Sequence, residues 1–109
     1  MRRTRTYSPA TLDAVGTLGM LIAAARRERR MTVAELCDRA GITPNTVRAI
    51  ETGAPTVAVG VVFEVAMLLG VPLFAPNASD LPTVRARASE RLALLPASVR
   101  RTREVDDDF

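Results

Sequence analysis

The most constraining feature of this chain is the stretch Met31–Gly53, MTVAELCDRAGITPNTVRAIETG, which encodes two short helices joined by a glycine turn. Thr32 stands three residues before Glu35, which is the spacing of a capping box, where the hydroxyl and the carboxylate each accept a backbone N–H at a helix start. A helix is therefore expected to begin at about Val33. Gly41 supplies the flexible backbone that a helix stop or a tight turn needs.

A second helix is expected over Pro44–Glu51. Thr43 can cap this helix, and Pro44 at its first position loses nothing by lacking an N–H. The helical spacing puts Val47 and Ile50 on the buried face, so polar side chains remain outside: Asn45, Thr46 and Arg48. Two helices with a short turn between them, the second carrying polar groups outward, form the helix-turn-helix plan that places a recognition helix in the DNA major groove.

Residues from about Leu18 to Phe74 resemble the XRE/Cro-type helix-turn-helix domain of phage repressors and bacterial antitoxins. The resemblance implies a five-helix, all-α, lambda-repressor-like unit, with Val71–Phe74 as its short fifth element. It also implies a structural ion pair between Arg26, near the end of the first helix, and Glu51, which closes the recognition helix. Beyond this unit, the chain is expected to add one C-terminal helix and flexible termini.

Two positions depart from the family pattern. Val33 stands where the family usually has a Gln that touches phosphate, and Pro44 stands where a base-reading Gln is frequent. Base readout is therefore expected to depend on Asn45, whose amide suits adenine, on Arg48, which suits guanine or phosphate, or on the arms of the chain. The full set of expected DNA contacts adds the hydroxyls of the recognition helix and two arginines before the motif: Thr43, Asn45, Thr46, Arg48, Arg27 and Arg30.

A longer resemblance links the chain to HipB-like antitoxins, which accompany HipA-like kinase toxins. It rests on the segments LIAAARRERRMT, GVVFEVAMLLGVPLF and ERLALLP and on the VDDDF end. The resemblance implies a repressor that neutralises a HipA-like kinase toxin and autoregulates its own operon. Two alternatives stay open: a stand-alone transcription regulator without a toxin, and a protein-interaction adaptor that has kept the fold but no longer binds DNA.

Composition agrees with packed helices rather than a sheet sandwich. Hydrophobic residues make up 48% of the 109 residues but aromatic residues only 4%, so one small core must be built from aliphatic side chains. All 15 basic residues are Arg and the net charge is +3, with the arginines concentrated toward the start and the acids Asp106–Asp108 at the end. The sequence contains no His and no Gly-rich phosphate loop. We therefore expect no enzyme activity, catalytic residue, metal or cofactor.

The start of the chain divides into an arm and a long helix. Residues 1–7 carry three arginines and are expected to be disordered, either reaching the minor groove or phosphates or remaining solvated. The helix-turn-helix domain is expected over residues 8–76. It opens with a helix over Pro9–Arg30, where Gly16 and Gly19 are positions at which a bend could occur.

A helix over Val57–Leu69, with Thr56 as its cap, is apolar on all sides. Gly60, Gly70 and Pro72 interrupt the apolar run, so a buried helix is favoured over a membrane span, and a cytoplasmic location follows. Such a helix is hard to bury within one small subunit, so part of it is expected to contact a second copy or a partner: Val59, Phe63 and Met67. The single cysteine, Cys37, is interpreted as a core residue, and a redox-sensing thiol is the alternative hypothesis.

The C-terminal third is expected to form a partner-contacting helix over residues 77–96, stopped by Pro96, and a disordered tail over residues 97–109. The helix repeats apolar residues on one side, from which partner contacts are expected at Val84, Leu92 and Leu95. Phe109 would anchor the acidic tail in a basic cleft of a partner, or the tail stays solvated. Together these features predict a homodimer on a palindromic double-stranded operator.

Overall fold

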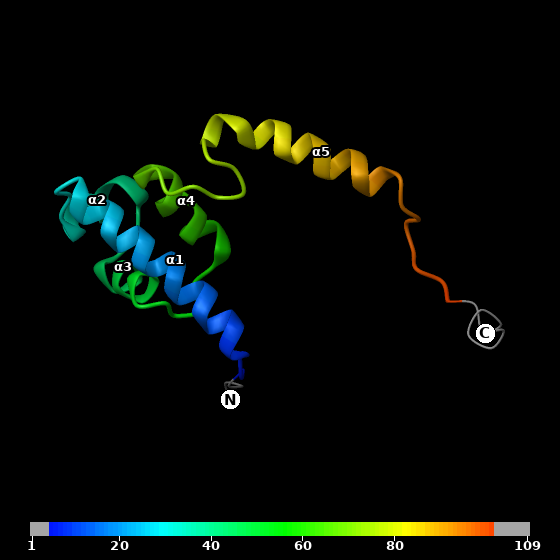
Figure 1. Ribbon diagram of the computed structural model, residues 1–109. Helices are drawn as coiled ribbons and strands as arrows, with labels where there is room; N and C mark the ends of the chain where they lie inside the picture. Colours follow the sequence, from blue (N-terminus) through cyan, green and yellow to red (C-terminus); the bar gives the residue numbers. More distant parts are fainter. Residues whose placement is uncertain (1–4, 102–109) are drawn as a thin grey trace.

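The computed structural model describes residues 5–101, and every regular element in that range is helical (Figure 1). The five α-helices and one 3₁₀ helix are α1 (Pro9–Glu28), α2 (Val33–Ala40), α3 (Pro44–Glu51), α4 (Val59–Leu69), η1 (Ala78–Asp80) and α5 (Leu81–Ala93). The predicted all-α class is confirmed. Met1–Thr4 and the last eight residues lie outside the described range, so the expected contacts of the arm and of Phe109 lie largely or wholly outside it as well.

The long first helix begins as predicted and ends two residues early. The Ser8 hydroxyl accepts the backbone N–H of Thr11 at 3.2 Å, which satisfies one free donor at the start of α1. At the other end Arg30 adopts a left-handed φ of 54°. The N–H of Met31 then donates to the carbonyl of Arg26 at 3.0 Å, so the chain reverses there and does not continue the helix.

Gly16 and Gly19 do not interrupt α1, contrary to the bend considered from the sequence. Gly19, together with Gly53 just beyond α3, allows α1 to lie directly against the end of α3. A Cβ on Gly19 would collide with the carbonyl oxygen of Ile50, and a Cβ on Gly53 would lie 2.8 Å from the Cα of Gly16. Backbone contact at this point fixes where the recognition helix crosses α1.

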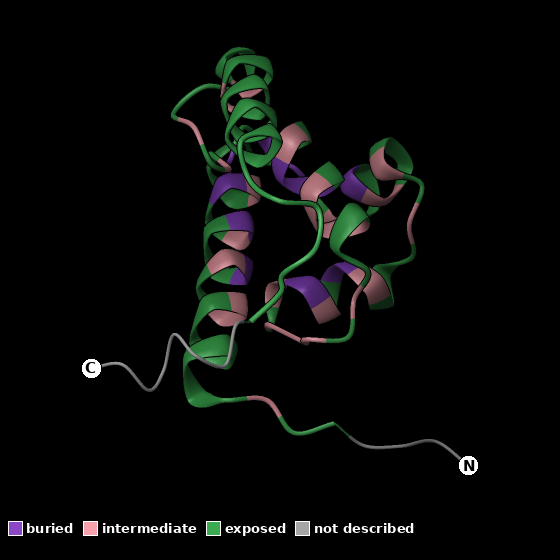
Figure 2. Cartoon of the chain, turned by 90° about the vertical axis from the view of Figure 1, so that its right-hand side faces the viewer, coloured by how far each residue is buried: buried purple, intermediate pink, exposed green. Residues whose placement is uncertain are grey.

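The core lies where α1, α2, α3 and α4 meet (Figure 2). Each of these helices contributes at least one fully buried aliphatic side chain: Ile22, Leu36, Val47, Val65 and Leu69. Burying an aliphatic side chain of this size contributes about 1.5–3 kcal/mol relative to leaving it in water. Aliphatic packing of this kind holds α2 and α3 in position and needs no aromatic residue at its centre.

The fourth helix differs in two ways from the sequence prediction. It begins at Val59 and not at Val57, and the prediction of Thr56 as its cap is wrong, because Ala58 occupies the cap position and no side chain caps the helix. Val57 is half-buried against the core, which holds this segment outside the helix. Of the residues expected to face a partner, Val59 is 65% exposed. Phe63 and Met67 are half-buried.

The expected short fifth element of the domain is not helical. Val71 is buried in the core, and Phe74, with a left-handed φ of 63°, carries a ring that is 77% exposed. Pro72 between them cannot donate a helical hydrogen bond. The fifth α-helix is therefore α5, which projects away from the other four (Figure 1). Within residues 5–101, no helix is long and apolar enough to cross a bilayer.

Candidate nucleic-acid interface

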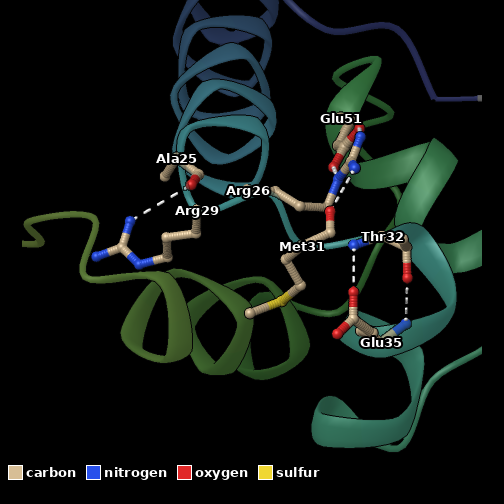
Figure 3. A network of polar contacts seen from close by, with 7 residues as sticks. All are labelled: Ala25, Arg26, Arg29, Met31, Thr32, Glu35 and Glu51. Atoms are coloured by element: carbon tan, nitrogen blue, oxygen red, sulfur yellow. Dashed lines mark hydrogen bonds and ion pairs between the residues drawn. The ribbon is translucent and has the colours of Figure 1, made fainter.

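The local sequence fixes α2 as predicted. The Thr32 hydroxyl accepts the N–H of Glu35 at 3.0 Å, and the Glu35 carboxylate accepts the N–H of Thr32 at 2.9 Å (Figure 3). The hydrogen bond from the Thr32 backbone lowers the pKa of Glu35, so this cap stabilises α2 at neutral pH and weakens as acid protonates the carboxylate. Gly41, with φ 68°, then ends the helix in a left-handed turn.

The turn leads into α3, whose start is ordered by two threonines. The Thr43 hydroxyl accepts the N–H of Thr46 at 3.3 Å and lies 3.1 Å from the Thr46 hydroxyl. Thr43 is exposed and Thr46 is half-buried, so both hydroxyls are close to the surface but already share local hydrogen bonds. Pro44 occupies the first helical position as predicted. Since Pro44 has no N–H and the N–H of Thr46 is bonded to Thr43, the backbone N–H of Asn45 is the donor that the first turn of α3 offers to an anionic phosphate.

The outer face of α3 carries two polar side chains that already contact each other. Asn45 and Arg48 are both exposed, and Nη2 of Arg48 donates to Oδ1 of Asn45 at 3.2 Å. This contact orients the Asn45 NH₂ group as a free donor and leaves further guanidinium N–H groups of Arg48 available. Bidentate recognition of adenine by Asn45 also needs Oδ1 as an acceptor, so the two side chains must either share that oxygen or separate on DNA.

Arg26 and Glu51 form the most specific polar contact of the domain (Figure 3). Nε of Arg26 lies 2.7 Å from Oε2 of Glu51, and Nη2 lies 3.1 Å from Oε1. A third donor, Nη1, reaches the carbonyl oxygen of Met31 at 3.0 Å. Both side chains are nearly buried, with 11% and 12% exposed. The hydrogen bonds from Arg26 to Glu51 raise the pKa of Arg26, although partial burial opposes the shift.

This arrangement ties three places in the chain together: the last turn of α1, the residue before the cap of α2 and the end of α3. The bidentate geometry fixes both the distance and the orientation of the two helices, which a single hydrogen bond would not do. The pair therefore holds the recognition helix at a set position on α1.

The arginines near the end of α1 point in different directions. Arg27 and Arg30 are exposed, and within residues 5–101 neither donates a side-chain hydrogen bond, so both are free to meet a phosphate. Arg29 points away from Arg26 (Figure 3), and Nη1 of Arg29 donates to the carbonyl oxygen of Ala25 at 3.4 Å. Its Nη2 lies 2.8 Å from the place of a Cβ on Gly70, at the end of α4. Arg29 thus lies beside the end of α4, a placement that the sequence alone did not reveal.

A shallow groove between α3 and the start of α4 was also missed from the sequence. Polar residues of the turn and recognition helix form one side, and small or aliphatic residues form the other: Gly41, Ile42, Thr43, Asn45, Thr46, Ala49, Val57, Ala58 and Val61. Val33, where the family usually has a phosphate-contacting Gln, is half-buried and packs on the core. The apolar run from Val57 was the only sequence signal for this groove.

Comparison with known proteins assigns the domain. Residues 22–75 match the family model described as helix-turn-helix. This segment is a helix-turn-helix domain. The match supports a DNA-binding transcription regulator, and it includes α2, α3, α4 and the Arg26–Glu51 pair. No curated protein and no solved structure matched the chain.

The residues expected to contact a partner are distributed over two surfaces. Phe63, on α4, packs edge-on against Phe74, with ring centroids 5.9 Å apart and planes at 84°. On α5, Val84 is half-buried and Leu92 is 71% exposed, while Leu95 follows in the turn after the helix. Cys37 is half-buried and packs against the core, as expected for a structural thiol.

Proposed function

We propose that this helix-turn-helix protein is a sequence-specific repressor that inserts α3 into the DNA major groove. The observation that carries the proposal is the exposed Asn45–Arg48 pair on a helix whose position is set by the Arg26–Glu51 ion pair. Polar side chains on a fixed helix can meet base edges with little loss of conformational entropy on binding. The wrong bases then leave these side chains unpaired, which is the source of discrimination.

Positioning contacts to the backbone complete the proposed interface. The backbone N–H of Asn45 and the exposed guanidinium groups of Arg27 and Arg30 are suited to phosphate. Thr43 and Thr46 are proposed as secondary contacts through their hydroxyls. The aliphatic side of the groove, including Ala58, is suited to sugars and to thymine methyl groups.

The repressor is proposed to act as a homodimer on a palindromic operator. One eight-residue recognition helix reads only a few base pairs, so two copies are needed for a site of useful length. The exposed apolar residues of α4 and α5 lie outside the α3 face and support a second contact surface on the same chain.

The finer proposal is that the repressor is the antitoxin of a HipA-like kinase toxin. Its support is the resemblance of the segments around α1, α4 and α5 to HipB-like antitoxins, together with a C-terminal helix that leaves the DNA-binding domain. Co-purification with the product of a neighbouring kinase-like reading frame is the test. If no such reading frame lies beside this one, the antitoxin proposal is contradicted and a stand-alone regulator is the remaining proposal.

The DNA-binding proposal is tested with the full chain and the DNA upstream of its own reading frame. Fluorescence anisotropy with that DNA and with a shuffled duplex of equal length, at two salt concentrations, separates specific from non-specific binding. We expect tighter binding to the upstream DNA, on the order of 10³-fold at physiological salt. Equal affinity for both duplexes would favour the protein-interaction adaptor instead.

A further inference from the structure

The fifth helix has a face that no other part of residues 5–101 buries. None of its residues is buried, and Leu92 is 71% exposed. The helix projects from the four-helix core (Figures 1 and 2). A helix of 13 residues is marginal when isolated in water, and Asp80 at its start makes no capping hydrogen bond. Its stability therefore calls for contact with another surface.

The apolar residues on this face are symmetric about Ala88. Leu81 and Leu95 lie seven positions before and after Ala88, and Val84 and Leu92 lie four positions before and after it. On a helix of 3.6 residues per turn, the four of these residues that lie within α5 fall within an arc of about 80°, and Leu95 continues the spacing two residues beyond the last helical residue. The spacing of the apolar positions is therefore the same in both chain directions along one narrow stripe of five residues, which we call the α5 stripe.

Such symmetry is what a two-fold axis requires. When two identical helices pack antiparallel across a two-fold axis at Ala88, each Leu81 meets the partner copy's Leu95, and each Val84 meets its Leu92. The small Ala88 side chain meets its own copy at the axis, where the two backbones come closest. A partner helix of different sequence does not require this symmetry, so the symmetry favours a second copy of the same chain.

We propose that the α5 stripe pairs with the α5 stripe of a second copy of this chain, antiparallel and centred on Ala88. The inference rests on the proposed dimeric repressor and names the surface that forms the dimer. Phe74, 77% exposed, belongs to the same surface, because it lines one groove with Leu81, Val84, Ala88 and Leu92.

The area available agrees with a weak but specific dimer. The helical part of the stripe, from Leu81 to Leu92, is about 16 Å long. With Phe74 it offers on the order of 500 Å² per copy, close to the lower limit of about 1,000 Å² in total for a specific interface. Pairing should therefore depend on protein concentration in the micromolar range, and operator DNA would strengthen it by holding two copies together.

Charges at the rim predict the salt dependence. Arg85 and Arg91 border the stripe on opposite edges, so each copy brings a basic rim to the interface. Salt screens like charges, and pairing should tighten as ionic strength rises. An acidic partner on this face would show the opposite trend.

The first experiment is sedimentation equilibrium of the full chain without DNA. Leu92→Glu should raise the dimer Kd by about tenfold or more, since it places a charge against apolar side chains. Leu94→Glu is the matched control, because Leu94 is 86% exposed and lies off the stripe. A monomeric wild type at tens of micromolar, equal effects of the two variants, or pairing that weakens with added salt would each overturn the proposal.

The second experiment tests the register by cross-linking. In a Cys37→Ala background, Ala88→Cys should form a covalent dimer on mild oxidation, whereas Glu90→Cys, which lies on the opposite face of α5 and outside this groove, should not. Equal cross-linking of both would overturn the antiparallel arrangement about Ala88. Both experiments are done without DNA, so they test pairing independently of operator binding. If the chain pairs through α5 but binds no operator, only the proposed function is contradicted. If Leu92→Glu leaves operator binding unchanged at nanomolar protein, only this inference is contradicted.

Discussion

Single side chains of α3 carry the proposed readout of DNA bases. Asn45 and Arg48 lie on the exposed face of α3 and share one hydrogen bond of 3.2 Å. The same contact couples their roles, because the oxygen that would accept from adenine already accepts from Arg48. Substituting either residue changes both the free chain and the complex, so the two should be compared singly and together.

Asn45→Ala and Arg48→Ala should each weaken operator binding by about 1–3 kcal/mol and random-duplex binding much less. The double variant should lose less than the sum of the two, because each single change already disturbs the shared contact. Anisotropy titrations measure all three, with Thr17→Ala on the exposed side of α1 as the control. Equal losses on both duplexes would reassign the side chains to phosphate.

Glu51→Ala should lower the free energy of unfolding by about 2–4 kcal/mol, because it leaves the nearly buried Arg26 guanidinium with only the Met31 carbonyl as partner. Glu51→Gln keeps one acceptor oxygen and should cost less. Urea denaturation followed by circular dichroism measures the difference. An unchanged midpoint in Glu51→Ala would show that the pair does not support the fold.

The left-handed φ of Arg30 is unfavourable for a residue with a Cβ. Arg30→Gly should therefore stabilise the domain by about 1 kcal/mol, while Arg27→Gly, inside the last turn of α1, should destabilise it by a similar amount. Both changes remove one exposed arginine, so their effects on non-specific DNA affinity should be alike. Thermal melts and salt titrations of the two variants separate the backbone effect from the charge effect.

At the level of elements, the crossing of α1 and α3 depends on Gly19 and not on Gly16, although both glycines lie in α1. Gly19 lies against the carbonyl of Ile50, whereas a Cβ on Gly16 would meet no atom within 4 Å. Gly16→Ala should stabilise α1 by about 1 kcal/mol through helix propensity. Gly19→Ala should cost about 1–3 kcal/mol, because the helices must separate.

Denaturation midpoints of these two variants test the crossing directly. Both changes add one methyl group to the same helix, so propensity alone predicts the same gain in each. A stabilising Gly19→Ala would show that α1 and α3 are not in backbone contact at this point. A loss of operator affinity in Gly19→Ala beyond its loss of stability would show that the crossing also sets the position of the recognition helix.

For the whole molecule, DNA binding and pairing are assigned to separate parts of the chain. The recognition face is on α3, and the α5 stripe lies beyond the helix-turn-helix domain. Leu92→Glu should therefore weaken binding to a full palindrome by about tenfold or more and leave binding to an isolated half-site unchanged. Titrations of both duplexes measure this, and an equal loss on both would mean that α5 contributes to DNA contact itself.

The sequence alone determined the local features of the recognition unit. The Thr32–Glu35 box, Gly41 and the Thr43–Pro44 start are short-range signals, so the bounds of α2 and α3 followed from neighbouring residues only. The all-α class followed from aliphatic composition and helical spacing. The Arg26–Glu51 contact was suggested by family resemblance, because no local rule relates residues so far apart in the chain.

Only the tertiary structure decided the features that depend on distant backbone. Gly19 looked like a weak point in a helix, but it permits the approach of Ile50 from another helix. Val57 appeared helical by pattern, yet packing on the core holds it outside α4. Arg29 was one of four similar arginines until the fold placed it beside Gly70. In each case the deciding neighbour comes from another segment of the chain, and periodicity within one segment carries no information about it.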